Sequence, residues 1–299
     1  MAGDRRARLV RAATYASMAA ALTLIATKFV AWMLTGSVSL LSSLIDSSLD
    51  LLASAITWFA VRHATDPADH EHRFGHGKAE ALSALAQAGF ILASTVALIF
   101  AAGERLLLPH ALVREEVGIA VSLFSIVVTG ALALFQRHVV RQTGSVAITA
   151  DALHYRSDLL INLAVAAALA VTMHFHILWI DSAMAIAIAL YLLTGVRSIL
   201  MQSLDILMDR ELPQADRLRI EEIVRAHPAA RHLHGLRTRT SGMTRFVEMH
   251  VAFDPDLPLA EAHRYGDEIE AAIKAVFPDA EVLLHHDPFG LEEPQRDPV

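Results

Sequence analysis

Six long apolar segments, separated by short polar ones, occupy the first two thirds of the chain. They cover approximately residues 13–34, 40–61, 79–102, 117–135, 147–173 and 178–200. A helix of about 20 apolar residues crosses the ~30 Å hydrocarbon core of a bilayer, and each segment is close to that length. The pattern therefore predicts a membrane-spanning bundle of six α-helices.

The pattern changes after residue 208, where the apolar segments become shorter. Helical periodicity covers residues 213–227 and 258–277, and the alternation typical of strands covers residues 232–241, 243–253 and 281–286. A Ser-Gly turn separates the first two strands, which indicates a hairpin. The order α-β-β-α-β predicts a small two-layer α+β domain.

We therefore expect three regions in the chain. Residues 1–208 form an all-α six-helix transmembrane domain, residues 209–290 form a separate small domain, and the polar residues 291–299 form a disordered tail. We find no internal repeat in the sequence.

Composition supports a membrane protein and limits the chemistry open to it. Hydrophobic residues make up 54% of the chain and charged residues only 19%, whereas soluble domains carry about 25% charged residues. The formal net charge of -7 gives no reason to expect nucleic-acid binding. The chain has 16 histidines and no cysteine, so any metal site must use histidine, carboxylate, backbone or water.

The positions of lysine and arginine predict the orientation in the membrane. Basic residues precede the first helix and lie in the second and fourth loops, whereas the first loop has no charge. They are Arg5, Arg6, Arg8, Arg11, Arg62, Arg73, Lys78, Arg137 and Arg141. We expect a multi-pass protein with both termini in the cytoplasm, which agrees with the even number of spans.

Four ionisable residues fall inside the second and fifth apolar segments. Asp46 and Asp50 are four residues apart, as are His154 and Asp158, so each pair occupies one face of its helix. An aspartate at the centre of a membrane helix costs at least ~2.5 kcal/mol. If the two faces meet, three carboxylates and one imidazole surround one point, and such a tetrahedral N/O site suits Zn²⁺.

A simpler alternative explains each pair separately. Either pair can join helices by hydrogen bonds or line a water-filled cavity without binding an ion. The presence of both pairs in one bundle favours the metal site. Lys28, inside the first apolar segment, is either a functional cation or a lysine whose charged end reaches the membrane interface, and we favour the second interpretation.

The second loop and the C-terminal region hold most of the remaining candidate ligands. Asp69, His72 and His76 can meet at one ion if the loop curls, although a solvated histidine-rich loop explains them equally well. The C-terminal region contains His232, His234, His250, His263, His285, His286 and Asp287. A surface-histidine explanation stays open for that region too. His63, at a helix end, is interpreted as solvated.

Several motifs resemble those of the cation diffusion facilitator family, and in particular its bacterial ferrous-iron and zinc efflux pumps. They are TGSVSLLSSLIDSSLDLLAS, HRFGHGKAEALSALAQ, ADALHYRSDLLIN, LMDRELP, LRTRTSGMTRFVEMH and LLHHDPF. The similarity extends from about Leu9 to Phe289, which is nearly the whole chain. Together these motifs are highly specific.

The resemblance implies a homodimer in the bacterial inner membrane with a cytoplasmic, metallochaperone-like domain. It implies a transport site at Asp46, Asp50, His154 and Asp158, a loop site at Asp69, His72 and His76, and a two-ion cytoplasmic site at His234, His250, His263, His285 and Asp287, with Asp287 bridging. It also implies salt bridges of Lys78 and Asp209 at the dimer interface and a hydrophobic gate at Leu153.

Three departures from the family pattern are visible. The second loop has an additional histidine and glutamate, His70 and Glu71, which leave the ligand set of the loop site open. His286 stands where close relatives have glutamine, so it adds a ligand or leaves only backbone contacts. Arg156 lies beside the transport site, and we expect it to point away, because a cation directed at the site would compete with the metal.

These features predict a transporter that exports a divalent metal, with Zn²⁺ first and Cd²⁺, Fe²⁺ or Co²⁺ as alternatives, in exchange for protons. Zn²⁺ is expected both as transported ion and as regulator, with no organic cofactor and with membrane lipid as surroundings. The other interpretation is a membrane-anchored metal sensor or chaperone without transport. An enzyme is not expected, since all four membrane ligands are used and no nucleotide motif such as a P-loop occurs.

Overall fold

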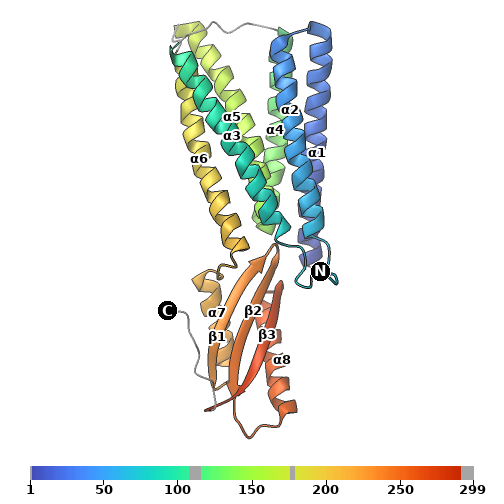
Figure 1. The fold of residues 1–299 in the computed structure, drawn as a ribbon, viewed down its shortest axis with the longest axis vertical. Coiled ribbons are helices and arrows are strands. Elements are labelled where there is room, and N and C mark those ends of the chain that lie inside the picture. Colours follow the sequence, from blue (N-terminus) through green and yellow to red (C-terminus); the bar gives the residue numbers. More distant parts are fainter. Residues whose placement is uncertain (1, 108–115, 176–178, 291–299) are drawn as a thin grey trace. The chain divides into compact units, whose positions relative to one another are not determined.

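The computed structural model describes residues 2–107, 116–175 and 179–290, and these form eight α-helices and three β-strands (Figure 1). The helices are α1 (Ala2–Thr35), α2 (Val38–Ala64), α3 (Ala79–Leu107), α4 (Glu116–Thr143), α5 (Val146–Phe175), α6 (Ile180–Leu207), α7 (Gln214–Ala226) and α8 (Leu259–Val276). The strands are β1 (His232–Ser241), β2 (Thr244–Phe253) and β3 (Ala280–Pro288). The predicted fold class is confirmed, and the predicted tail at 291–299 lies outside the described residues.

The long helices are membrane-spanning by length and composition. Among the described residues, five segments meet both criteria: Arg5–Thr35, Leu40–Ala64, Ala79–Glu104, Ala120–Thr143 and Ser182–Leu207. Each helix extends beyond the apolar segment that predicted it, and α1 already begins at Ala2. The reason is that backbone hydrogen bonds continue past the hydrocarbon core, where polar side chains are tolerated.

The same four-residue turn connects α1 to α2 and α4 to α5. Gly36 and Gly144 follow the ends of α1 and α4 with φ of 65° and 68°, a left-handed conformation that glycine adopts without strain. Ser37 then accepts a hydrogen bond from Leu40 N at 3.4 Å, and Ser145 accepts one from Ile148 N at 3.3 Å. Each serine therefore caps the helix that follows it.

This turn corrects the expectation that the sequence has no repeat. The letters TGSV occur at 35–38 and again 108 positions later at 143–146. The same offset relates Asp46 to His154 and Asp50 to Asp158. The repeat was missed because, apart from the TGSV turn and a few positions such as those around Asp50 and Asp158, the two copies differ in sequence.

A buried polar network links five of the long helices around Asp151. Its carboxylate, fully buried, accepts hydrogen bonds from Ser17 Oγ of α1 at 2.5 Å, Gln136 Nε2 of α4 at 2.7 Å and Gln87 Nε2 of α3 at 3.3 Å. Gln87 also donates to the carbonyl oxygen of Ala53 in α2. Partners on three neighbouring helices, with α2 joined through Gln87, offset the cost of burying Asp151 of α5.

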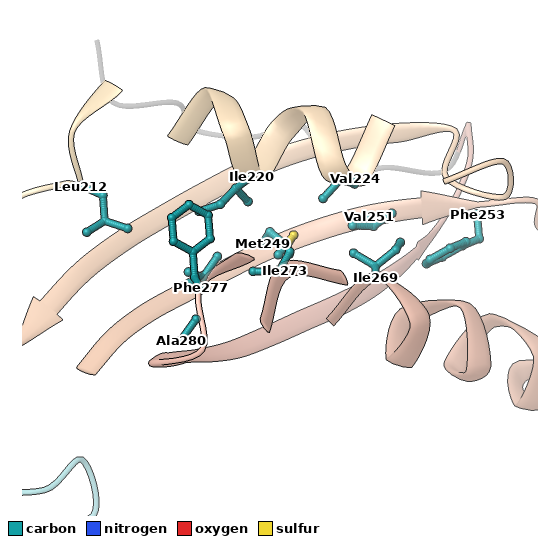
Figure 2. Close-up of a cluster of buried hydrophobic side chains, with 11 residues drawn as sticks. Leu212, Ile220, Val224, Met249, Val251, Phe253, Ile269, Ile273, Phe277 and Ala280 are labelled. Atoms are coloured by element: carbon teal, nitrogen blue, oxygen red, sulfur yellow. The ribbon is translucent and has the colours of Figure 1, made fainter. Parts of the chain in front are cut away.

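The C-terminal unit is a three-stranded sheet with two helices packed on one face. β2 is the central strand, antiparallel to β1 and parallel to β3. Alternate residues of β2, including Met249, Val251 and Phe253, point to the helices and pack with Ile220 of α7 and Ile269 of α8 (Figure 2). Because side chains alternate along a strand, the intervening residues point to the opposite face.

His286 of β3 lies on the helix-covered face, beside a glycine of α8. Its ring stacks on Phe253 with centroids 5.5 Å apart. A Cβ placed on Gly266 would lie 2.3 Å from His286 Nε2. Glycine at 266 therefore provides the space that His286 occupies.

We predict that Gly266→Ala destabilises this unit by about 1–3 kcal/mol, because the added methyl group overpacks a closed site. Hydrogen exchange of α8 and β3 in the full-length protein should become roughly tenfold faster. In a His286→Ala background the same substitution should no longer destabilise the unit, because the clash is gone and alanine is a better helix former than glycine. Equal destabilisation in both backgrounds would contradict this explanation.

Candidate metal sites

A cavity of about 500 Å³ lies within the membrane bundle. All six long helices contribute to its lining, and its polar residues include Lys28, Ser43, Asp46, Ser47, Asp50, Ser94, Thr95, Ser125, Thr129, His154, Ser157, Asp158 and Asn162. Hydroxyl, amide and carboxylate groups inside a membrane bundle are typical of an ion pathway.

Three of the four predicted membrane ligands meet at this cavity. His154 Nε2 lies 3.1 Å from Asp50 Oδ1 and 3.8 Å from Asp158 Oδ2. One ligand atom from each residue lies within 4.8 Å of the others. In tetrahedral zinc sites with bonds of 2.0–2.1 Å, adjacent ligand atoms are about 3.3 Å apart. The group therefore has nearly the spacing that a bound ion requires.

Asp46 and Lys28 also line the cavity but stand outside this group. Asp46 lies one helical turn from Asp50 along α2 and is exposed to the cavity. Lys28 Nζ donates to Ser47 Oγ at 2.6 Å and to the carbonyl oxygen of Ser43 at 3.3 Å. Lys28 therefore points into the bundle instead of reaching the interface, and it places a positive charge beside the carboxylates.

The two other residues singled out on α5 point toward α6. Arg156 donates to the hydroxyl of Tyr191, and its guanidinium lies 5.6 Å from the centre of that ring. Leu153 packs against Gly195, where an added Cβ would lie 2.7 Å from Leu153 Cδ2. Arg156 therefore points away from the cluster, as its charge requires.

The second loop brings Asp69, His72 and His76 together. Asp69 Oδ1 lies 3.4 Å from His72 Nδ1, and Asp69 Oδ2 lies 3.4 Å from His76 Nε2. His76 is buried, and neither of its ring nitrogens has a hydrogen-bond partner within the described residues. Such a nitrogen is costly unless a ligand satisfies it, and both distances fit the tetrahedral spacing.

Asp69 is held as a carboxylate by its own turn. Its Oδ1 accepts backbone hydrogen bonds from His72 at 2.6 Å and Glu71 at 2.9 Å. These bonds, that of His72 first, lower the pKa of Asp69. Asp69 therefore stays ionised, and available to a metal, at pH values where an ordinary aspartate begins to protonate.

Sheet register aligns three histidines on the face that the helices leave uncovered. His234 of β1 pairs with His250 of β2, and His250 pairs with His285 of β3. Asp287 follows His285 by two residues and shares its face. Neighbouring strands are about 4.8 Å apart, so the register alone places these side chains within reach of one another.

The two oxygens of Asp287 face different histidines. Oδ2 lies 3.0 Å from His234 Nε2 and 3.1 Å from His250 Nδ1, whereas Oδ1 lies 3.1 Å from His285 Nε2. Because each oxygen of Asp287 has a histidine nitrogen beside it, the two oxygens could each bind a different ion, with the carboxylate as the bridge. Nitrogen and oxygen donors at these distances fit zinc.

The remaining predicted residues lie elsewhere. His263 of α8 is 3.8 Å from Asp267, and its ring centre is 6.0 Å from that of His286. His286 itself is separated from His285 and Asp287 by the sheet; burial, and then His263 and His285, lower its pKa. Asp209 is 3.4 Å from Arg239, and Lys78 lies just before α3.

Comparison with known proteins identifies the chain's relatives. Residues 14–208 match the family described as cation efflux transmembrane domain, and residues 212–289 match that described as cation efflux protein, cytoplasmic domain. The chain belongs to the cation efflux family. The family predicted from the sequence motifs is thereby confirmed.

Individual members of the cation efflux family match along nearly the whole chain. The cation-efflux pump FieF of Shewanella oneidensis is 45% identical over 283 residues, 95% of each chain. FieF of Pectobacterium atrosepticum is 45% identical over 291 residues, 97% of each chain. Among solved structures, the zinc form of CzrB is 34% identical, covering 29% of this chain and 99% of its own, with a TM-score of 0.26.

Two cavity or network residues of this cation efflux protein were not assigned roles from the sequence. Lys28 was interpreted as an interfacial lysine, although its place inside an apolar segment could have indicated a residue of the cavity. Asp151 stands within the motif ADALHYRSD, three residues before His154. An ionisable group so near a predicted ligand inside a membrane helix was sufficient reason to expect that Asp151 has a role in the bundle.

We predict that Asp69→Asn weakens Zn²⁺ binding at the loop by more than about tenfold, and by the same factor at every pH from 5.5 to 8. The factor is constant because Asp69 stays ionised throughout that range. Zn²⁺ titration of full-length protein carrying Asp50→Ala and Asp287→Ala measures it. A factor that shrinks toward pH 5.5 would show that the pKa of Asp69 is raised above that of an ordinary aspartate, which contradicts the direction given by its backbone hydrogen bonds.

Proposed function

We propose that this chain exports a divalent metal ion, most readily Zn²⁺, from the cytoplasm in exchange for protons. The observation that carries the proposal is the group formed by Asp50, His154 and Asp158 at a cavity that all six long helices line. Ionisable side chains inside a membrane bundle need a compensating partner. A bound cation and bound protons are the two partners that these ligands accept.

Exchange follows from the ligands themselves. Carboxylate and imidazole bind a metal only when deprotonated, so an arriving ion expels the protons that an empty site holds. His154 is the natural coupling group, because imidazole is the side chain that ordinarily titrates near physiological pH. If the site opens to each side in turn, an inward proton gradient drives the metal outward.

Zn²⁺ is proposed first because nitrogen and oxygen donors at tetrahedral spacing suit it. The donor set holds no sulfur, and oxygen-rich sites also accept Fe²⁺, Co²⁺ and Cd²⁺. Among the relatives compared above, FieF is named a cation-efflux pump, and CzrB was solved in a zinc form. Family membership supports cation efflux, and the metal itself is our proposal.

We place the protein in the bacterial inner membrane as a homodimer with both termini in the cytoplasm. Residues 1–208 would be its transport domain and residues 209–290 its metal-binding domain. Lys78 and Asp209 would form the salt bridges of the dimer interface. Leu153, packed against Gly195 of α6, would form the hydrophobic gate beside the transport site.

We assign a regulatory role to the ions at His234, His250, His285 and Asp287. Binding of metal to one conformation of the C-terminal domains stabilises that conformation in proportion to occupancy. Such binding would couple cytoplasmic metal concentration to transport. His263, remote from Asp287 in this structure, would join the site only after a rearrangement of α8.

The decisive experiment measures Zn²⁺-dependent proton flux in proteoliposomes. The wild-type chain should exchange Zn²⁺ for protons, and Asp50→Ala should reduce the rate by more than about tenfold, since it removes a ligand. Glu104→Gln, an exposed carboxylate at the end of α3, is the matched control and should retain the wild-type rate. Zn²⁺ binding without flux would instead favour a membrane-anchored sensor or chaperone.

Metal preference provides a separate prediction. His154→Asp makes the membrane group all oxygen, so discrimination should relax toward Cd²⁺ and Mn²⁺. Initial transport rates for Zn²⁺, Cd²⁺, Fe²⁺ and Mn²⁺ in the same vesicles measure the change. An unaltered ranking of metals would mean that His154 is not a ligand.

A further inference from the structure

We propose that His63, in the last turn of α2, is the fourth ligand of the loop site, which makes that site a closed structural centre. The inference rests on the proposal that the loop binds the divalent ions that the chain transports. It adds a ligand to Asp69, His72 and His76. It also assigns the loop a role distinct from transport.

The first argument is the number of donors. Asp69, His72 and His76 supply three ligands, and structural zinc sites in proteins are almost always four-coordinate. A three-ligand site leaves one position to water, as catalytic zinc sites do. A fourth side chain at the right place would close the coordination shell.

The second argument is position. The ring of His63 lies 4.1 Å from that of His76 and 6.5 Å from that of His72, centre to centre. Its side chain is 47% exposed, so it can rotate without breaking core packing. Zn–N bonds are 2.0–2.1 Å long, so His63 would have to rotate its exposed side chain to reach an ion held by the other three.

The third argument is orientation. His63 Nδ1 faces Asp66 Oδ2 at 3.7 Å, which leaves Nε2 directed elsewhere. Asp66 is itself 3.7 Å from Arg11, and Arg11 donates to Thr65 Oγ1 at 2.7 Å. A carboxylate behind an imidazole is the usual support of a zinc-bound histidine, because it fixes the ring and its tautomer.

A closed site here has a mechanical consequence. His63 belongs to α2, whereas His76 stands three residues before the first residue of α3, Ala79. An ion bound to both would fasten the end of one helix to the start of the next across the loop of residues 65–78. With four protein ligands and no water, such a site exchanges metal slowly and does not belong to the transport path.

The test uses full-length protein in which Asp50→Ala and Asp287→Ala disable the other two sites. X-ray absorption at the zinc edge should find three imidazoles and one carboxylate around Zn²⁺ in this background. Adding His63→Gln should leave two imidazoles and raise the Kd for Zn²⁺ by about tenfold or more. His63→Asp, which restores an oxygen ligand, should bind more tightly than His63→Gln.

His138→Gln is the matched control, since His138 is also an exposed histidine near a helix end, and its Nε2 lies 2.8 Å from Nε2 of Gln142. It should change neither the imidazole count nor the Kd. Two imidazoles in the parent protein, or no Zn²⁺ bound there, would overturn the inference. Because the flux experiment uses the wild-type chain, either proposal can fail while the other stands.

Discussion

Charge inside a membrane bundle must be compensated, and this requirement organises the transmembrane part of the protein. The described helices meet it in two ways. Around Asp151, the protein supplies its own compensation through hydrogen bonds from Ser17, Gln87 and Gln136. Around Asp50, His154 and Asp158, the compensating charge comes from Lys28 and, in the function we propose, from a cation or protons bound in the cavity. A satisfied carboxylate stabilises one arrangement of helices, whereas an unsatisfied group selects a ligand.

The C-terminal unit solves a different problem, since water is available there and only geometry must be supplied. Register across three strands aligns His234, His250 and His285, and the two-residue period of β3 adds Asp287 to the same face. The same alternation directs His286 to the helices, where Gly266 makes space for it. Two adjacent histidines therefore have unrelated surroundings, a difference that follows from strand geometry alone.

Much of this was accessible from the sequence, and the exceptions have physical reasons. Apolar length predicted the helices, and four-residue spacing predicted the meeting of Asp50 with His154 and Asp158. Spacing could not show that Asp46 stands outside the group of Asp50, His154 and Asp158. Residues one turn apart share a helical face but need not reach the same ion. Lys28 and His63 were given ordinary explanations, since a long or exposed side chain reaches several partners and only coordinates choose among them. His263 was included in the cytoplasmic site through resemblance, and the described conformation of α8 places it beside His286.

The duplicated TGSV turn has a consequence for how the two halves of the helix bundle are oriented in the membrane. Because three helices separate the two copies, the halves that carry them run oppositely through the membrane. Their equivalent positions nevertheless differ in chemistry: Lys28 of α1 corresponds to Gln136 of α4, and Ser43 corresponds to Asp151. In one half the ammonium of Lys28 lines the cavity and bonds to serines of α2, whereas in the other half Gln136 and Asp151 are hydrogen-bonded to each other. Two identical antiparallel copies would present the same groups to both sides of a bilayer, and these unequal pairs remove that equivalence.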